Sequence, residues 1–315
     1  MIPVDLITGM LGSGKTTFLR AYAQKLIGRG MSIGIIENDY GAINIDRLLL
    51  GDLDEEVCDV EMVIGGDEDC RRRRLKTKLI SMAMCGYDRI LIEPSGVYET
   101  DEFFDLLQEE PLDRLCRPGN VIALADASLG EELSPSEEYL LAEQAACAGR
   151  VVLSHMDEAG EEAAERVRSH INRALAAIHA DRRIRADEVL ARSGPGLTEE
   201  EFTGLARCSY VSASYVRLQV LKEHAYQSLF FFHPGLSGEE IRARAEKIFA
   251  DPACGRISRI KGFAPAEEGF TEINLRPGQM KLTASPAGQD VIIVIGEHPD
   301  EERISAYFDK TAQTE

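Results

Sequence analysis

The 315-residue sequence has no tryptophan, only six histidines and no long apolar segment. Because no apolar run approaches the ~18 residues of a membrane-spanning helix, we expect no transmembrane segment. The start, MIPVDLITGM, has neither a basic leader nor a small-residue cleavage site. Seven cysteines, an odd number scattered along a long chain, do not suit the paired framework of a small secreted fold. We therefore expect reduced thiols and a cytoplasmic location.

Basic residues are also in the minority, with 35 Lys and Arg against 54 Asp and Glu and a formal net charge of −19. Most of such a surface repels a polyphosphate backbone, so nucleic acid is not an expected partner. The apolar fraction of 44% is sufficient for globular cores. The length fits one large domain or two of ordinary size, and we favour two.

Short apolar segments alternate with helical segments over roughly the first two thirds of the chain. This alternation predicts an α/β fold in which helices cover both faces of a mostly parallel sheet. The helix predicted after the first strand stops at Gly28. The predicted strands lie within residues 4–9, 32–39, 89–96, 120–127 and 150–157, and residues 207–214 are a candidate for the last strand.

The pattern changes at about residue 227, where strand-like segments follow one another with few helices between them. Successive strands of this kind predict an antiparallel sheet and hence a smaller α+β domain. We therefore predict a first domain at residues 1–214 and a second at residues 227–315, with the boundary at 213–227.

A glycine-rich motif separates the first predicted strand from the first helix. The segment GMLGSGKT, from Gly9 to Thr16, matches G-x-x-x-x-G-K-[ST]. In this motif backbone N–H groups and the helix N-terminus bind phosphates, the lysine reaches the β- and γ-phosphates, and the hydroxyl ligates Mg²⁺. The sequence thus predicts a nucleoside triphosphate site. Its predicted phosphate-binding residues are Gly9, Gly12, Ser13, Gly14, Lys15, Thr16 and Thr17.

A second motif, RILIEPSG, supplies an acid and a glycine at the end of another predicted strand. A P-loop enzyme needs a carboxylate on a neighbouring strand to hold Mg²⁺ or its water, and Glu93 fits this role. Gly96 lets a backbone N–H approach the γ-phosphate. The alternative interpretation of Glu93 is an ordinary exposed acid at a strand end.

These motifs resemble a known family. GMLGSGKTTFL, ENDYGAINID and IEPSG resemble the CobW/HypB/UreG family of GTPases, most closely its CobW-like branch. SRIKGF and DVIIVIGEHPDEERI resemble the C-terminal domain of that branch. The resemblance implies a Mg²⁺-dependent protein that binds GTP, hydrolyses it to GDP, and delivers a metal, commonly zinc or cobalt, to a client metalloprotein.

The first switch of this family, N-E-x-G, corresponds here to NDYG, residues 38–41. Asp39 therefore stands in the place of a glutamate. Its shorter carboxylate can still face Mg²⁺ or a transported metal, and the resemblance implies a catalytic role beside Lys15 and Glu93. As an alternative, NDYG is a good turn sequence with no further role.

The family also carries C-x-C-C after a glycine, and here Gly66 is followed by Asp67, Glu68, Asp69 and Cys70. Only the last thiol remains, so the site is harder and less selective for zinc than a thiolate cluster. Asp67, Asp69 and Cys70 are the candidate ligands for Zn²⁺ or Co²⁺, with Asp39, Cys58 or Glu61 as possible additions. The alternative is a solvated acidic loop, and the two interpretations stay open.

Base recognition in these GTPases normally uses N-K-x-D, which is replaced here by Ser154, His155, Met156 and Asp157. Asp157 retains the acceptor for guanine, and the imidazole of His155 can stack on a purine. GTP is the preferred nucleotide, with ATP or relaxed specificity as the alternative. The segment VSAS, residues 211–214, resembles a second base-contacting loop. Asp126, which ends a predicted strand, is interpreted first as a helix cap and second as a site residue.

The leading hypothesis is a GTPase whose Lys15, Thr16 and Glu93 position a phosphoanhydride for attack by water. Without an evident arginine finger in the chain, turnover is expected to be slow, and a client or a homodimer partner would accelerate it. One rival is a nucleotide-dependent sensor or scaffold with negligible hydrolysis. A second is a P-loop kinase that phosphorylates a small molecule.

Overall fold

The computed structural model describes residues 1–39, 57–64, 68–130, 133–160, 162–192, 196–217 and 227–308. The chain divides into two compact units, Met1–Val220 and Leu221–Glu315. Across the described ranges, no helix combines the length and the apolar character needed to cross a bilayer.

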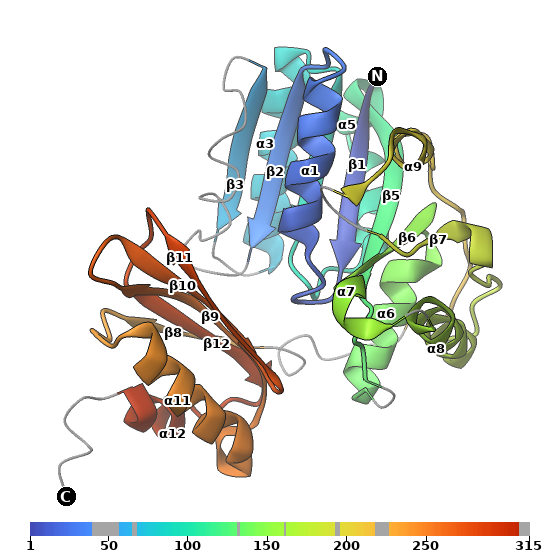
Figure 1. The fold of residues 1–315 in the computed structure, drawn as a ribbon. Helices are drawn as coiled ribbons and strands as arrows, with labels where there is room; N and C mark the ends of the chain where they lie inside the picture. The colour runs from blue at the N-terminus through green and yellow to red at the C-terminus, as the bar shows by residue number, and fades with distance from the viewer. Residues whose placement is uncertain are drawn as a thin grey trace, which may run out of the picture. The chain divides into compact units, whose positions relative to one another are not determined.

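The first unit is built on a seven-stranded sheet with the order β3-β2-β4-β1-β5-β6-β7 (Figure 1). Every neighbouring pair of its strands is parallel, which confirms the predicted α/β sheet. The central strands are apolar along most of their length because helices cover both faces. The strands are β1 (Ile2–Gly9), β2 (Ile33–Asp39), β3 (Cys58–Ile64), β4 (Arg89–Pro94), β5 (Cys116–Asp126), β6 (Arg150–Ser154) and β7 (Val189–Leu190).

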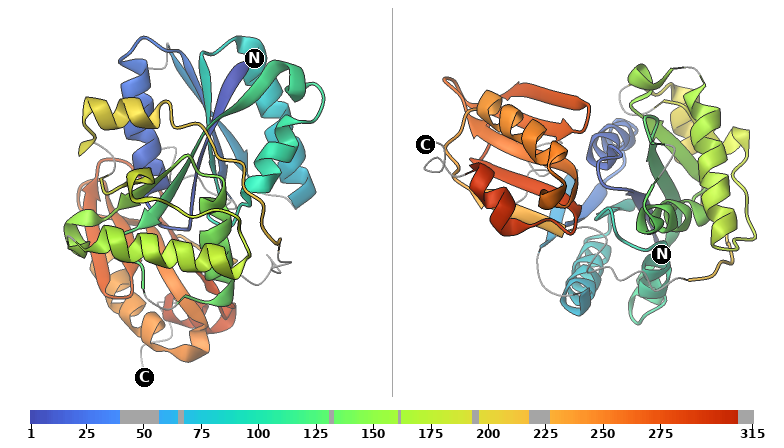
Figure 2. Two further views of the ribbon diagram at one scale, coloured as in Figure 1. Left: turned by 90° about the vertical axis from the view of Figure 1, so that its right-hand side faces the viewer. Right: turned by 90° about the horizontal axis from the view of Figure 1, so that it is seen from below.

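Two hydrophobic clusters attach the helices to opposite faces of this sheet. Helices α1 and α9 pack on one face, and α3, α4, α5, α6 and α8 contribute to the cluster on the other. The view from below in Figure 2 separates α1 from α3 across the strands. The helices are α1 (Lys15–Ile27), α3 (Glu68–Cys85), α4 (Thr100–Leu107), α5 (Leu112–Leu115), α6 (Pro135–Ala146), α7 (Met156–Ala159), α8 (Ala163–Ala177), η1 (Ala186–Glu188) and α9 (Glu199–Leu205).

Local sequence fixes where several helices begin. Helix α6 starts with a capping box, in which Ser134 accepts from the Glu137 backbone N–H while the Glu137 carboxylate accepts from the Ser134 N–H. Pro135 occupies the first helical position, where the missing N–H does not matter. Thr198 and Glu201 form the same box at α9, within the predicted turn and helix start.

The parallel arrangement gathers several strand ends at one edge of the sheet. Gly9, Pro94, Asp126 and Ser154 each close a parallel strand, so the loops that follow them lie at the same carboxyl edge. Strand β1 lies between β4 and β5, where the chain switches from building one side of the sheet to the other. Open α/β sheets bind ligands at this edge and at such a switch point.

The prediction of a last strand at residues 207–214 is wrong. Within this segment only Tyr210 makes a bridge, to Ala148, and the last strand of the sheet is β7. Ser209 has a φ of 57°, which interrupts the extended backbone that a strand needs.

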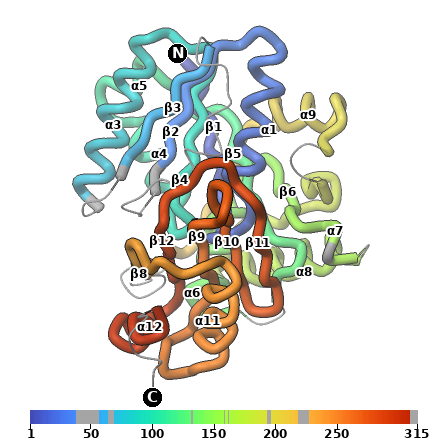
Figure 3. The backbone as a smooth tube through the Cα atoms, turned by 60° about the vertical axis from the view of Figure 1, so that its left-hand side comes forward, coloured from blue at the N-terminus to red at the C-terminus, as the bar shows by residue number. Residues whose placement is uncertain are grey.

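The second unit contains a five-stranded antiparallel sheet with the order β11-β10-β9-β12-β8, which confirms the predicted α+β architecture (Figure 3). Helices α11 and α12 pack on one face through a cluster that includes Ile241, Ile292 and Ile304. The elements are β8 (Gln227–Phe232), α11 (Gly238–Ala250), η3 (Pro252–Cys254), β9 (Arg256–Pro265), β10 (Phe270–Arg276), β11 (Gln279–Ser285), β12 (Val291–Glu297) and α12 (Glu301–Phe308).

Candidate functional site

The glycine-rich loop between β1 and α1 has a backbone that requires its glycines. Gly9 has a φ of 145°, and a Cβ on it would lie 2.4 Å from the carbonyl oxygen of Leu124. Gly12 and Gly14 have φ values of 81° and 83°, in the left-handed region that other residues rarely adopt. The loop therefore bends tightly and delivers Lys15 directly into the first turn of α1.

Lys15 is folded back over this loop. Its side chain is buried, with the residue 7% exposed, and Nζ donates to the carbonyl oxygens of Gly9 at 3.0 Å and Met10 at 3.3 Å. The first turn of α1 contains no acidic residue. An ammonium group and the partial positive charge of a helix N-terminus are thus placed together, which favours a bound anion.

Thr16 connects the loop to the neighbouring strand. Its hydroxyl donates to Glu93 Oε1 at 2.8 Å, and both residues are half-buried. Ser13 is buried, whereas Thr17 is exposed. A hydroxyl beside a carboxylate at the end of a phosphate loop is a donor set that suits Mg²⁺, so the residues present fit this ion.

Glu37 is a carboxylate that the sequence reasoning passed over. It lies on β2 directly beside Glu93 in the parallel register and is only 3% exposed. An acid that directly follows the apolar segment IGII within the same strand is the signal that could have drawn attention to it. Glu37 and Glu93 give the edge next to the loop two neighbouring acidic side chains.

Gly96 lies against the phosphate loop itself. A Cβ at this position would stand 2.5 Å from the backbone nitrogen of Leu11 and 2.8 Å from its Cα. The segment after β4 and the loop after β1 therefore touch through their backbones, a contact that any larger residue would prevent.

His155 and Asp126 are paired at the carboxyl ends of β6 and β5. Nδ1 of His155 lies 3.1 Å from Asp126 Oδ2 and 3.1 Å from Ser154 Oγ. Asp126 Oδ1 accepts from the backbone N–H and hydroxyl of Ser128. Burial alone would raise the pKa of Asp126, but the hydrogen bonds from His155 and Ser128 outweigh it and hold the pKa well below its usual range.

The remaining residues of the SHMD segment lie close by. Ser154 closes β6, and its Cβ is 3.4 Å from where a Cβ on Gly14 would be. His155 adopts a φ of 54° and precedes α7, which contains the exposed Asp157. The segment therefore borders the phosphate loop and presents its aspartate to solvent at the same sheet edge.

The prediction that residues 211–214 contact the base is wrong. The N–H of Val211 donates to the carbonyl of Cys147, and the carbonyl of Ser209 accepts from Val121. Cys147 precedes β6, whereas Asp157 follows it, so VSAS lies at the amino end of this strand, opposite Asp157. One purine cannot reach both ends of the strand.

The predicted metal ligands are only partly visible. Asp67 and the side chain of Asp39 lie outside the described residues. Asp69 is exposed and Cys70 half-buried in the first turn of α3, where Arg73 Nη2 is 3.7 Å from Cys70 Sγ. In the part of the chain that the structure describes, no three His, Cys, Asp or Glu residues come together as a metal site.

Cys58 and Glu61, two of the possible additions to the predicted metal ligands, lie away from Cys70. Cys58 begins β3 and Cys70 follows its other end, and the 7 residues of this strand span roughly 20 Å. Glu61 lies in the middle of β3 and forms an ion pair with Lys78 at 2.6 Å. The suggestion that Cys58 completes a site with Cys70 is therefore wrong, because the strand holds the two thiols apart.

A parallel sheet, a glycine loop with a buried lysine and an acid on the adjacent strand define a P-loop nucleotide-binding fold. The family model described as CobW/HypB/UreG, nucleotide-binding domain, matches residues 3–181, and the chain belongs to this family.

Individual relatives match part of the chain. The zinc chaperone YjiA of Escherichia coli is 30% identical over 169 residues, which are 51% of this chain and 51% of that protein. The zinc chaperone CobW of Pseudomonas aeruginosa is 28% identical over 212 residues, covering 54% and 53%. The chain thus spans about half the length of the curated relatives it matches. Among solved structures, Zn(II)-bound YjiA GTPase from E. coli is 20% identical over 98% of both chains, with a TM-score of 0.36.

Proposed function

We propose that the first unit binds GTP together with Mg²⁺ and hydrolyses it slowly, and that this cycle drives delivery of a metal to a client protein. The observation that carries the proposal is the Thr16–Glu93 hydrogen bond of 2.8 Å at the end of a glycine loop that also holds Lys15. We assign the nucleotide to residues 1–214 and leave residues 227–315 as the second, CobW-like domain.

The residues of the chain divide the chemistry between them. The loop amides and Lys15 bind and orient the β- and γ-phosphates, and the amide of Gly96 binds the γ-phosphate. Thr16 and Glu93, with Asp39 from β2, would hold Mg²⁺. When bound, this ion neutralises charge on the phosphate oxygens. A client or a second copy of the chain would supply further positive charge and accelerate turnover.

The family membership and the names of the relatives support the metal cargo. Both relatives described above are zinc chaperones, and the YjiA structure contains Zn(II). In this chain we propose Asp67, Asp69 and Cys70 as cargo ligands. A set with one thiolate and several carboxylates binds zinc less selectively than a cysteine cluster, so we expect weaker and broader binding of Zn²⁺ and Co²⁺.

The residues proposed to contact the base support the choice of guanine over adenine. Asp157 is exposed at the correct edge and can accept hydrogen bonds from the N1 and N2 hydrogens of guanine, while His155 is fixed by Asp126 as a surface for the ring. Adenine has no hydrogen at N1 and cannot satisfy such a carboxylate.

The base assignment has a direct test. In Asp157→Asn the amide carbonyl still accepts from N1–H, but the amide NH₂ now donates and matches the C2 carbonyl of xanthine. Titration of both proteins with GTP, XTP and ATP should show that the variant loses affinity for GTP and gains affinity for XTP. Asp181→Asn, at a distant turn, is the control that should leave the preference unchanged. Wild-type binding of ATP as tight as that of GTP would contradict the guanine assignment.

A further inference from the structure

The loop that follows β4 is held from two sides. On one side Gly96 touches the backbone of Leu11 in the phosphate loop. On the other side helix α6 supplies Gln144, which is 2% exposed and whose Nε2 donates to the carbonyl oxygen of Gly96 at 2.9 Å. The same nitrogen reaches the carbonyl of Tyr98 at 3.5 Å. One buried amide therefore supports the segment at two points.

The orientation of this amide follows from its neighbours. Both backbone groups that Gln144 faces are carbonyls, which accept and cannot donate, so the NH₂ group must point toward them. Gln144 Oε1 is buried and has no hydrogen-bond partner among the residues that the structure describes. The side chain thus leaves its own acceptor unsatisfied while it holds Gly96.

The preceding residue of α6 fixes the far end of the same segment. Glu143, 1% exposed, accepts from the backbone N–H groups of Thr100 at 2.6 Å and Asp101 at 3.3 Å, at the start of α4. Tyr215 donates to Asp101 at 2.7 Å and lies 3.0 Å from Glu143. With both ends attached to α6, the segment between Gly96 and Asp101 has little freedom to move from the phosphate loop.

We propose that Gln144 is a positioning residue for γ-phosphate recognition: by holding the carbonyl of Gly96, it keeps the Gly96 amide in place beside the phosphate loop. This inference rests on the proposed function and adds to it a residue on a helix that does not touch the nucleotide. A diphosphate has no γ-phosphate for the Gly96 amide to bind, so only the binding of a triphosphate should depend on Gln144.

The test compares the two nucleotide states in the full-length chain. Gln144→Met keeps the length of the side chain and removes the donor. Calorimetric titration with GDP and with a non-hydrolysable GTP analogue, both with Mg²⁺, should show about tenfold weaker binding of the analogue, which corresponds to about 1.4 kcal/mol. Affinity for GDP should stay within about twofold, the variation expected without loss of a contact. Gln108→Met, at an exposed position after α4, is the matched control and should change neither value.

Each outcome separates the two claims. If wild type binds the analogue and GDP but Gln144→Met weakens both equally or neither, the positioning role is overturned while the proposed function stands. If wild type binds no nucleotide, the proposed function itself fails. Should the variant not fold, hydrogen exchange of wild type decides: residues 96–98 must gain protection with the analogue and not with GDP, and equal protection overturns the inference.

Discussion

The hydroxyl of Thr16 donates to Glu93 Oε1 over 2.8 Å and joins the first turn of α1 to the strand β4, 77 residues further along the chain. The P-loop motif was expected to direct Thr16 at Mg²⁺, and the IEPSG motif was expected to direct Glu93 at the same ion. The contact brings these two side chains together. Their proximity follows from the parallel pairing of β1 with β4, which places the two strand ends at one edge.

Removing the hydroxyl should reduce the dependence of nucleotide binding on Mg²⁺. Thr16→Val keeps the shape of the side chain, and we expect its affinity for the Mg²⁺-triphosphate to fall by at least about tenfold, the effect of losing one ligand of roughly 1.4 kcal/mol. In EDTA the two proteins should bind alike. Thr77→Val, at an exposed site on α3, provides the control. Undiminished Mg²⁺ dependence in Thr16→Val would contradict the assignment.

Gly96→Ala should damage the site by steric conflict. The added Cβ would lie 2.5 Å from the Leu11 nitrogen, so the backbone of the phosphate loop must shift. We expect a loss of about 1–3 kcal/mol in stability and a loss of triphosphate affinity. Gly204→Ala, in α9 with no atom within 4 Å of its new Cβ, should instead stabilise the protein by about 0.5–1 kcal/mol. Urea unfolding of the two variants measures both changes in stability. Equal stability of Gly96→Ala and Gly204→Ala relative to wild type would refute the account of Gly96.

Glu143 should make stability depend on pH. Burial raises its pKa from the usual 4.5 to about 8, although the hydrogen bonds from Tyr215 and Thr100 oppose this shift. Between these values the folded chain retains a proton that the unfolded chain releases, so stability is full below the unfolded pKa and falls as pH rises toward 8, by roughly 1.4 kcal/mol per pH unit.

Glu143→Gln removes this titration. Urea unfolding curves collected from pH 5 to 9 should show wild type losing stability relative to the variant as pH rises, with the difference levelling off above the folded pKa. A constant difference across this range would show that Glu143 does not titrate as described.

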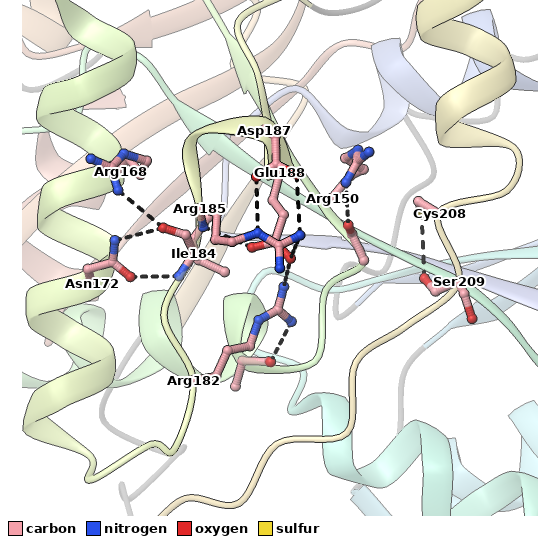
Figure 4. Close-up of polar contacts among 12 residues, drawn as sticks. Arg150, Arg168, Asn172, Arg182, Ile184, Arg185, Asp187, Glu188, Cys208 and Ser209 are labelled. Carbon is pink, nitrogen blue, oxygen red and sulfur yellow. Dashed lines mark hydrogen bonds and ion pairs between the residues drawn. The ribbon is translucent and has the colours of Figure 1, made fainter.

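Arg182 and Glu188 form a buried ion pair before β7 (Figure 4). Arg182 Nη2 lies 3.3 Å from Glu188 Oε1, and Nη1 donates to the carbonyl of Ala146 at 2.9 Å. Glu188→Gln leaves the guanidinium buried without its counter-charge, which should cost about 3–5 kcal/mol. Asp187→Asn removes an exposed partner of Arg185 and should cost less than about 1 kcal/mol. Thermal or urea unfolding measures the loss of stability in each variant. Equally small losses in Glu188→Gln and Asp187→Asn would contradict the claim that burial makes the Arg182–Glu188 pair costly to break.

The features that the sequence could predict are local or periodic. The glycines, Lys15 and Thr16 lie within eight consecutive residues, and the strand–loop–helix order around them fixes their geometry. Glu93 was found because an acid ends an apolar strand, which parallel pairing must place at the common edge. The antiparallel second sheet followed from the succession of strands without intervening helices.

The features that escaped prediction depend on register or on single backbone angles. Glu37 lies beside Glu93 only because β2 pairs with β4 in this register. The segment 207–214 looked like a strand, but the left-handed φ of Ser209 interrupts it. Gln144 reaches Gly96 across 48 residues of sequence, and no motif in α6 indicates that contact. Such relationships become visible only once the chain is folded.

The central claim is that the loop from Gly9 to Thr16 binds a Mg²⁺-nucleoside triphosphate. The most direct measurement is calorimetric titration of wild type and Lys15→Ala with a non-hydrolysable GTP analogue, with Lys25→Ala, a lysine paired with Glu199 at the surface, as the control. The account predicts saturable binding by wild type and the control, and a severe loss in Lys15→Ala. Absence of binding by wild type, or equal binding by all three proteins, would contradict it.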